Sequence, residues 1–423
     1  MVKRDRILEA YTEARDRYAA LGVDTEKALG KLKSIPISLP CWQGDDLTGF
    51  EKPDASLEGG GIQITGNYPG KARNIDELRL DLEQAFALIP GCHRLNLHSI
   101  YGDFEGQNVD RNAIEADLFS SWVDWAKTNN LKLDFNATCF SHPLAESGFT
   151  LSHRDSAIRE FWIEHVQRCR RISAFFGKEL GASSVHNLWI PDGSKDDPVD
   201  RWTHRFQLRE SLDTIYAEKY SNDFMKDAVE SKLFGLGSEA YVVGSHEFYL
   251  AYALKKGLMV CLDLGHFHPT ESVADKISSI LQFSKEILLH VSRGVRWDSD
   301  HVVILNDDLL QIGQEIVRGN ALNRVSVALD FFDASINRVG AWVIGTRATL
   351  KSFLLALLEP KDLLRRLEDK EDYFSRLAMV EELKAMPHGA VWNHYCQENN
   401  VPLAEEWMDS IKEYEIQVLS RRG

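Results

Sequence analysis

Carboxylates and imidazoles recur near the ends of short apolar runs between residues 228 and 333. The runs are AVESKLFG (228–235), MVCLDLGHFHP (259–269), ILLHVSR (287–293), VRWDSDH (295–301) and VSVALDFFD (325–333). Their candidate metal ligands are Glu230, Asp263, His266, His290, Asp298, Asp300 and Asp330. If the runs end side by side, these groups repel one another unless cations lie among them. The set is large enough for two divalent ions, and its mixed oxygen and nitrogen donors suit Mn²⁺, Co²⁺, Zn²⁺ or Mg²⁺ better than Ca²⁺.

Two pairs of polar side chains have the spacing of neighbours on one strand face. Glu230 and Lys232 form the first pair, and Asp298 and Asp300 form the second. Residues two apart in a strand point to the same side. Such side chains could therefore hold one cation from a single direction.

Several of the candidates also have a purely structural interpretation. Asp330 could cap a helix as readily as bind a metal, and Asp333, before ASINRVGAW, resembles a helix N-cap. His268 and His301 stand beside stronger candidates and are expected to support them or the fold. Trp189 could be core, or it could form a flat platform for a sugar face.

The hydrophobic pattern supplies a scaffold that would bring these strand ends together. Strand-like and helical segments alternate along the chain, which predicts parallel strands. Eight such strands predict a (β/α)₈ TIM barrel with its site at the carboxyl ends of the strands. An open doubly wound sheet is the alternative, but its Gly-x-Gly-x-x-Gly turn is absent. The predicted strands are 34–42, 94–101, 132–140, 184–191, 228–235, 259–265, 287–293 and 325–331. The predicted helices between them are 75–89, 114–128, 156–176, 206–220, 246–255, 271–283, 307–318 and 334–357.

The barrel is expected to carry additions at both ends of the chain. Residues 1–360 are predicted to form the barrel with an N-terminal helix at 3–21 and a long loop at 43–74. Residues 361–423 are predicted to form a C-terminal helical extension, with helices at 361–385 and 403–420. This extension would belong to the same domain or to a subunit interface. Gly177 is expected to end the helix at 156–176.

Composition limits the partners of the chain. The net charge of −15 over 423 residues argues against a nucleic-acid partner. The six cysteines are scattered without a CxxC pair, as expected of reduced thiols in a cytoplasmic protein. The N-terminus is too charged for a signal-peptide core, and no apolar run reaches transmembrane length, so no membrane partner is expected.

Other catalytic chemistries lack their motifs. The sequence contains no Gly-x-Ser-x-Gly elbow, no GxxxxGK[ST] loop and no HExxH. Near the strand ends, Lys232 and Arg293 are isolated cations rather than a phosphate-gripping cluster. A neutral polyol is therefore an easier substrate to defend than a phosphorylated one.

The sequence resembles the L-rhamnose isomerases of the enterobacterial and Bacillus type over nearly its whole length. The stretches that carry the resemblance are CWQGDD (41–46), GNYPGKARN (66–74), LNLH (95–98), CFSHPL (139–144), WIPDG (189–193), VESKLFG (229–235), LDLGHFHPTE (262–271), LLHVSR (288–293), VRWDSDHVV (295–303), LDFFDASINR (329–338) and WVIGTR (342–347). The resemblance implies a TIM barrel, a homotetramer, two divalent ions per subunit and reversible conversion of L-rhamnose to L-rhamnulose. Mn²⁺ is the expected ion, with Zn²⁺ or Co²⁺ as alternatives.

The resemblance also implies a role for each candidate residue. A structural ion would be held by Glu230, Asp263, His290 and Asp330. A catalytic ion would be held by His266, Asp298 and Asp300. His98, Trp189 and Lys232 would contact the sugar, and the loop at 50–74 would help to cover the site. The catalytic residues would be Asp298, His266 and Lys232.

This ligand set favours one mechanism for moving hydrogen between C2 and C1. A divalent cation on the sugar oxygens acts as a Lewis acid, so hydride can pass directly between the carbons while a water or Asp298 relays the proton. The competing enediol path needs a free carboxylate base, and nearly every candidate carboxylate is a predicted ligand. A barrel metallohydrolase and a non-catalytic sugar-binding protein are the alternative functions.

Overall fold

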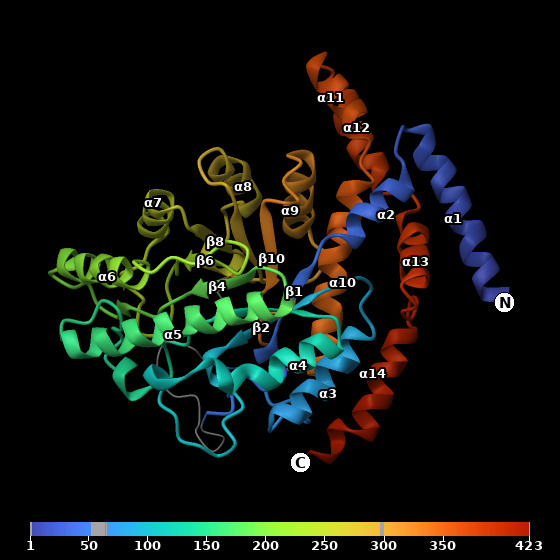
Figure 1. Cartoon of the computed structure of the whole chain (residues 1–423). Coiled ribbons are helices and arrows are strands. Elements are labelled where there is room, and N and C mark those ends of the chain that lie inside the picture. The colour runs from blue at the N-terminus through green and yellow to red at the C-terminus, as the bar shows by residue number, and fades with distance from the viewer. Residues whose placement is uncertain (1, 52–63, 65, 297–299, 423) are drawn as a thin grey trace.

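The centre of the molecule is a closed barrel of eight parallel strands (Figure 1). The computed structural model describes residues 2–51, 64, 66–296 and 300–422. The strands in barrel order are β1 (Ile37–Pro40), β10 (Val325–Leu329), β9 (Ile287–Val291), β8 (Met259–Asp263), β6 (Met225–Glu230), β4 (Ser184–Leu188), β3 (Lys132–Asn136) and β2 (Arg94–His98). The prediction of a (β/α)₈ TIM barrel is confirmed.

Helices between the strands cover the outside of the barrel (Figure 1). These helices are α3 (Ile75–Phe86), α4 (Ser120–Thr128), α5 (Ser156–Leu180), α6 (Arg201–Ile215), α7 (His246–Lys256), α8 (Val273–Leu281), α9 (Asp307–Arg318) and α10 (Arg338–Leu357). The helix α9 illustrates why they form: Asn306 caps its first turn, and Leu309, Ile312 and Ile316 form one buried stripe.

The barrel interior follows the two-residue period of its strands. Val185, Ala228, Cys261, Leu288 and Ala328 belong to a small buried apolar cluster, one residue from each of five adjacent strands. The position two residues further along each chain segment lies on the same inward side. Those next positions are polar: Asn187, Glu230, Asp263, His290 and Asp330. The strands therefore change from an apolar interior to a polar one at their carboxyl ends.

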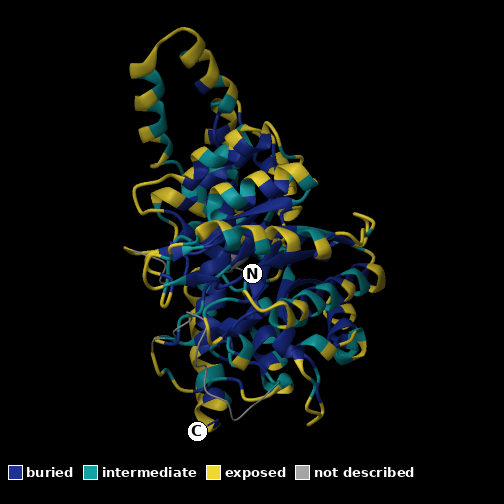
Figure 2. Cartoon of the chain, turned by 90° about the vertical axis from the view of Figure 1, so that its left-hand side faces the viewer, coloured by how far each residue is buried: buried dark blue, intermediate teal, exposed yellow. Residues whose placement is uncertain are grey.

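The terminal helices lie on one side of the barrel (Figure 1). They are α1 (Val2–Ala20), α2 (Thr25–Lys33), α11 (Lys361–Asp369), α12 (Tyr373–Leu383), α13 (His388–Glu398) and α14 (Glu406–Gln417). The helices α1 and α13 lie side by side, and α13 and α14 contact α10. The pair α11 and α12 projects beyond the rest of the molecule, with mostly exposed or half-buried residues (Figures 1 and 2). No single described helix has the length and apolar character to span a membrane, although the bent pair of α10 and α11 meets that test jointly.

Sequence patterning missed three features of this helical layer. The helices α2 and α13 were not predicted. The predicted helix at 361–385 is two helices, because Glu371 adopts a φ of 59° and Asp372 caps the second one. The helix predicted to end at Gly177 continues to Leu180 and ends at Gly181, whose φ is 62°. Gly177 instead permits close packing, since a Cβ there would lie 1.7 Å from the Phe224 carbonyl oxygen.

The strand-face placements of Lys232 and Asp300 are also wrong. The run 228–235 is strand only as far as Glu230, so Lys232 lies in the following loop and not on one strand face with Glu230. The described part of 295–301 is not a strand either, and Asp300 has a φ of 45°. A short antiparallel pair, β5 (Gly193–Ser194) and β7 (Tyr241–Val242), was not predicted and joins the loops after β4 and β6.

Candidate metal centre

The register of the barrel brings four predicted ligands to one place. Asp263 on β8 is paired with His290 on β9, and Glu230 on β6 is one strand further along the barrel. Asp330 follows β10 directly, and its backbone N–H donates to the Val291 carbonyl at the end of β9. Because all four strands are parallel, their carboxyl ends meet at the same end of the barrel.

The three carboxylates lie around the Nδ1 atom of His290. This atom lies 3.1 Å from Asp330 Oδ2, 3.2 Å from Glu230 Oε2 and 3.7 Å from Asp263 Oδ2. One ligand atom from each residue lies within 4.8 Å of all the others. Both ring nitrogens of His290 are buried and have no hydrogen bond of ordinary geometry to any described residue. Three carboxylates and one imidazole converging in this way fit a single divalent cation.

Without a cation, the cluster must hold protons to limit its charge. Burial raises the pKa of the Asp263 carboxyl to about 8, and the charges of Asp330 and Glu230 add to this effect. Burial opposes a charge on His290, but Cys261, Glu230 and Asp330 raise its pKa well above the usual value. Burial also opposes the Glu230 charge, yet His290 and His266 hold its pKa below the usual range. A divalent ion would replace these protons, so the donor set fits a metal on electrostatic grounds as well.

Cys261 is a fifth neighbour of the cluster. Its thiol sulfur lies within 4.8 Å of ligand atoms of Glu230 and His290. Burial raises the pKa of this thiol, with the Glu230 charge as the next cause. The set that includes Asp263 and Asp330 offers more carboxylate oxygens, which hard divalent cations prefer, so we assign the cation to that oxygen-rich set.

Hydrogen bonds hold the carboxylates in place. Asn187 Nδ2 donates to Glu230 Oε2, while the Gly265 N–H and the Ser292 hydroxyl donate to Asp263 Oδ1 at 2.6 and 2.9 Å. Asp263 thereby keeps its Oδ2 turned towards His290. Sequence reasoning missed these supporting residues, although Asn187 sits at the inward position two before Trp189 and the strand period could have indicated it.

The structure describes only two members of the second predicted ligand group, His266 and Asp300. The Nδ1 atom of His266, in the short helix η6 (Leu264–His266), lies 3.0 Å from Glu230 Oε1, so this histidine borders the first cluster. Asp298 lies outside the described residues, and Asp300 stands in a loop at a left-handed backbone position. The shared strand face expected of the two aspartates is therefore not found at Asp300 and stays a prediction for Asp298. The roles assigned to His266, Asp298 and Asp300 stay predictions.

The three predicted sugar contacts lie along one wall of aromatic side chains. His98 packs edge-on against Trp42 at 4.8 Å and against Phe140 at 5.6 Å between ring centroids. Phe140 in turn contacts Trp189 at 5.8 Å, and the Lys232 Nζ lies 5.3 Å from the Trp189 ring centroid. Burial lowers the pKa of His98 to about 3, so its ring is neutral at neutral pH. This wall offers flat apolar faces with polar atoms among them, which suits a sugar.

A buried arginine holds the loop that carries part of this wall. The Arg111 guanidinium donates to the carbonyl oxygens of Thr138 at 2.7 Å, of Phe140, and of Ser141 at 3.0 Å. It also pairs with Glu51, whose carboxylate is 3.1 Å away. The Thr138 hydroxyl lies 3.0 Å from His98 Nδ1. Sequence alone gave no sign of this role, because it depends on backbone carbonyls that only the fold assembles.

Asp333 is not a helix N-cap, contrary to the prediction from sequence. The N-cap of α10 is Asn337, whose side chain accepts from the Gly340 N–H. Asp333 closes a turn by accepting from the backbone and hydroxyl of Ser335. His301 Nδ1 lies 3.8 Å from Asp333 Oδ2, which agrees with a supporting position for this histidine.

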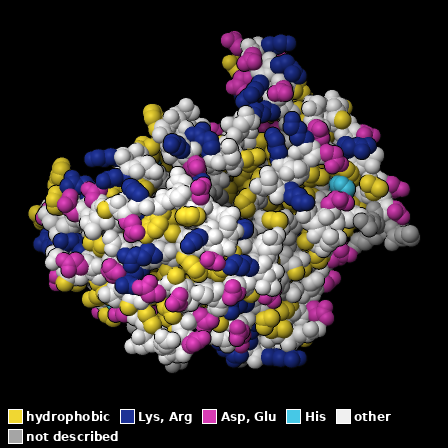
Figure 3. Space-filling model, in the orientation of Figure 1, with side chains coloured by type: hydrophobic (Ala, Val, Ile, Leu, Met, Phe, Trp, Pro, Cys, Tyr) yellow, Lys and Arg dark blue, Asp and Glu magenta, His cyan; other side chains and the backbone are white. Residues whose placement is uncertain are grey.

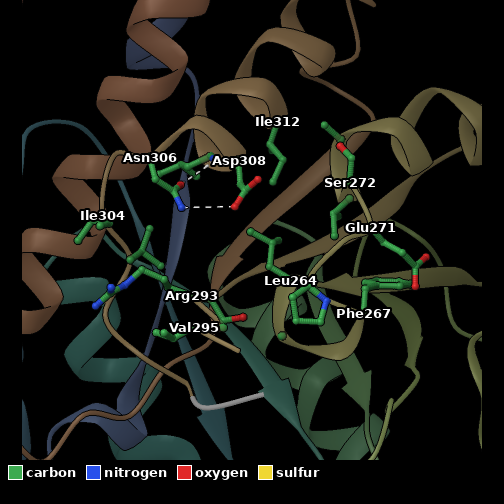
Figure 4. A pocket seen from close by; sticks show the side chains of 18 of the residues that line it. Leu264, Phe267, Glu271, Ser272, Arg293, Val295, Ile304, Asn306, Asp308 and Ile312 are labelled. Atoms are coloured by element: carbon green, nitrogen blue, oxygen red, sulfur yellow. Dashed lines mark hydrogen bonds between the residues drawn. The ribbon is translucent and has the colours of Figure 1, made fainter. Parts of the chain in front are cut away.

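Two cavities adjoin the carboxyl end of the barrel. One of about 300 Å³ reaches Lys232 and His266. The other, of about 170 Å³, lies between the loops after β8 and β9 and the start of α9 (Figure 4). Its labelled side chains include Leu264, Phe267 and Arg293, and none of the four cluster residues lines it.

The chain has close relatives over its full length. The model of the family "L-rhamnose isomerase (RhaA)" matches residues 5–422. The L-rhamnose isomerase of Rhodopirellula baltica is 55% identical over 423 residues, covering 100% of this chain and 99% of that protein. The L-rhamnose isomerase of Yersinia pseudotuberculosis serotype IB is 58% identical over 416 residues, covering 98% and 99%. The chain therefore belongs to the L-rhamnose isomerase family, which consists of enzymes that isomerise sugars.

Proposed function

We propose that the chain interconverts L-rhamnose and L-rhamnulose and needs divalent metal ions to do so. The observation that carries the proposal is the set of three carboxylates around His290 at the carboxyl end of the barrel, of which Glu230 and Asp263 are buried and Asp330 is half-buried. Membership of the L-rhamnose isomerase family supports the choice of sugar. Mn²⁺ is the proposed ion, with Co²⁺ or Zn²⁺ as alternatives.

The proposed metal ligands divide into two groups. Glu230, Asp263, His290 and Asp330 would hold one ion, and their mutual distances support this grouping. His266, Asp298 and Asp300 would hold the second ion. When bound, the ions supply Lewis acidity that favours negative charge on sugar oxygens. Asn187 and Ser292 keep the first group oriented through their hydrogen bonds.

The aromatic wall would orient the sugar over the metal centre. Trp189 offers a flat face to the sugar ring or chain, and Lys232 donates a hydrogen bond to a sugar oxygen. His98 stays neutral because of its burial, so it can hydrogen-bond to a sugar hydroxyl without adding charge. These contacts would hold C1 and C2 in place relative to the bound ions.

We propose that hydrogen moves from C2 to C1 of the aldose as hydride. The three carboxylates around His290 are arranged as ligands, which leaves none of them to abstract a proton from carbon. A water molecule or Asp298 would pass the remaining proton from O2 to O1. The reaction is then balanced within the substrate: the C2–H bond breaks, a C1–H bond forms, and C2 becomes the carbonyl carbon.

Isomerisation in deuterated water tests both the substrate and the path. With L-rhamnose as substrate, NMR at early conversion is expected to show L-rhamnulose whose C1 carries almost no deuterium, because hydride does not exchange with solvent. A reaction without enzyme corrects for spontaneous exchange. Extensive deuterium at C1 would refute the hydride path, while absence of ketose would refute the proposed substrate.

The assembly and location of the chain stay predictions. A homotetramer would give the projecting pair α11 and α12 a partner surface, and Tyr373, Phe374 and Leu377 on α12 are exposed apolar side chains that such an interface could cover. The division into a barrel at 1–360 and an extension at 361–423 and the cytoplasmic location are proposed on the sequence arguments given above.

A further inference from the structure

The cavity of about 300 Å³ beside the metal centre has an unusual charge for this chain. Its lining includes the cationic side chains Arg201, Arg205, Lys232 and Lys276, against the carboxylates Glu247 and Glu271. The lining is therefore net positive, whereas the chain as a whole carries −15. On the face seen in Figure 3, by contrast, basic and acidic side chains are interspersed.

Aromatic rings position three of these cations. The guanidinium carbons of Arg201 and Arg205, one turn apart on α6, each lie 5.4 Å from the Tyr241 ring centroid. On the α8 side, the Lys276 Nζ lies 4.5 Å from the Phe267 ring centroid. Contact with an aromatic face restrains a long cationic side chain while leaving its N–H groups available to another partner. The cavity is thus bordered by positive groups on two sides.

The nearby carboxylates only partly balance these charges. Glu271 pairs with Lys276 at 2.5 Å, and Asp197 pairs with Arg201. The Arg205 Nε–H donates to the Val243 carbonyl oxygen at 3.3 Å, a neutral acceptor. His246 contributes no charge at neutral pH, because burial and then Lys276 lower its pKa. Hydrogen bonds from its own backbone and from Ser245 lower the pKa of Glu247, and the charge of Arg205 adds to this effect, so Glu247 partly balances Arg205. An anionic ligand would give Arg205 a direct charged partner in addition to its neutral acceptor.

We propose that this cavity, the anion pocket, binds a phosphate dianion through Arg205 and Arg201. The dianion could be inorganic phosphate or the phosphoryl group of a sugar phosphate. Lys232 and His266 line the pocket and also belong to the proposed active site. A sugar phosphate held there would place its hydroxyl groups towards that site and compete with the neutral sugar. This competition rests on the proposed function, but phosphate binding does not.

The variants for a test lie on one face of α6. Arg209 follows Arg205 by one turn, pairs with Glu210 and does not line the pocket. Arg209→Gln therefore removes the same charge from the same helix outside the pocket. Arg205→Gln removes a positive charge inside the pocket. Arg201→Gln provides a second variant at a more exposed position.

Isothermal titration calorimetry of the metal-loaded enzyme at low ionic strength measures the binding directly. One arm titrates inorganic phosphate, and the other titrates D-fructose 1-phosphate. Arg205→Gln and Arg201→Gln are each expected to weaken binding about tenfold, because a charge-assisted hydrogen bond is lost, while Arg209→Gln binds like the wild type. Turnover of the neutral sugar by Arg205→Gln is expected to stay at the wild-type level.

The two arms separate the sources of the anion. Binding of inorganic phosphate that depends on Arg205 identifies a phosphate site, and binding of only D-fructose 1-phosphate identifies a sugar-phosphate site. No binding of either probe would overturn the proposal. Equal binding by wild type, Arg205→Gln and Arg201→Gln would also overturn it, since the anion would then bind elsewhere, such as at the metal ions. Because calorimetry needs no turnover, these results do not depend on the identity of the isomerised sugar.

Discussion

Replacement of Glu230 by Gln is expected to lower kcat on L-rhamnose by about a thousandfold, equivalent to about 4 kcal/mol of transition-state stabilisation. Gln keeps the size of the side chain but removes its negative charge. Glu230 contacts His290 at 3.2 Å and His266 at 3.0 Å, so it borders both proposed ligand groups. Loss of the Glu230 charge should weaken binding of the first ion and also disturb the position of His266. Steady-state kinetics with saturating Mn²⁺, alongside measured metal content per chain, checks this expectation.

Glu286→Gln is the matched control for this variant. Glu286 pairs with Lys226 of β6, the same strand that ends in Glu230, but it lies just before β9 at the opposite end of the barrel. The Glu286→Gln variant should have kcat and metal content close to the wild-type values. If Glu230→Gln kept wild-type kcat and a full complement of metal, the proposed ligand set would be wrong.

Removal of bound ions with EDTA is expected to lower the unfolding temperature by about 5 °C. A ligand that binds only the folded state at 1,000 times its Kd stabilises that state by about 4 kcal/mol, and a chain of this length converts such a loss into a shift of that size. The loss of folding free energy is larger because the metal-free cluster must hold three carboxylates around His290 without a cation. Differential scanning calorimetry before and after chelation, and after return of Mn²⁺, measures the shift.

Asp330→Asn shows whether this stabilisation comes from the proposed cluster. Asp330 Oδ2 lies 3.1 Å from His290 Nδ1, and removal of its charge relieves repulsion in the metal-free state while weakening the bound ion. The variant should therefore show a smaller drop on chelation than the wild type. Equal decreases in unfolding temperature in the two proteins would place the stabilising ion elsewhere. No decrease in the wild type would refute a structural ion.

The barrel could be predicted because its signals are local. Alternation of strand-like and helical segments predicted all eight strands, and the two-residue period explains why Glu230, Asp263, His290 and Asp330 face inward. The sequence indicates the ends of strands less clearly than their presence. Val229 and Leu233 continue an apolar pattern, but β6 ends at Glu230 and the chain turns towards β7, so Lys232 reaches the site from a loop.

Other features depend on contacts between distant segments. Gly177 has the sequence signature of a helix end, yet its role is to let α5 approach the backbone at Phe224. Arg111 acts on carbonyl oxygens of residues 138–141, a contact that sequence spacing does not encode. The supporting bonds from Asn187 and Ser292 likewise need neighbouring strands to be in register. The family resemblance, rather than periodicity, supplied the division of the ligands into two groups.

If the ligand cluster serves a metal-dependent isomerisation of L-rhamnose, the reaction depends on added metal. The most direct measurement is ketose formation from L-rhamnose by the metal-stripped chain, assayed with and without added Mn²⁺. We expect L-rhamnulose with Mn²⁺ and almost none without it. An equal rate in the absence of metal, or no ketose under either condition, would contradict it.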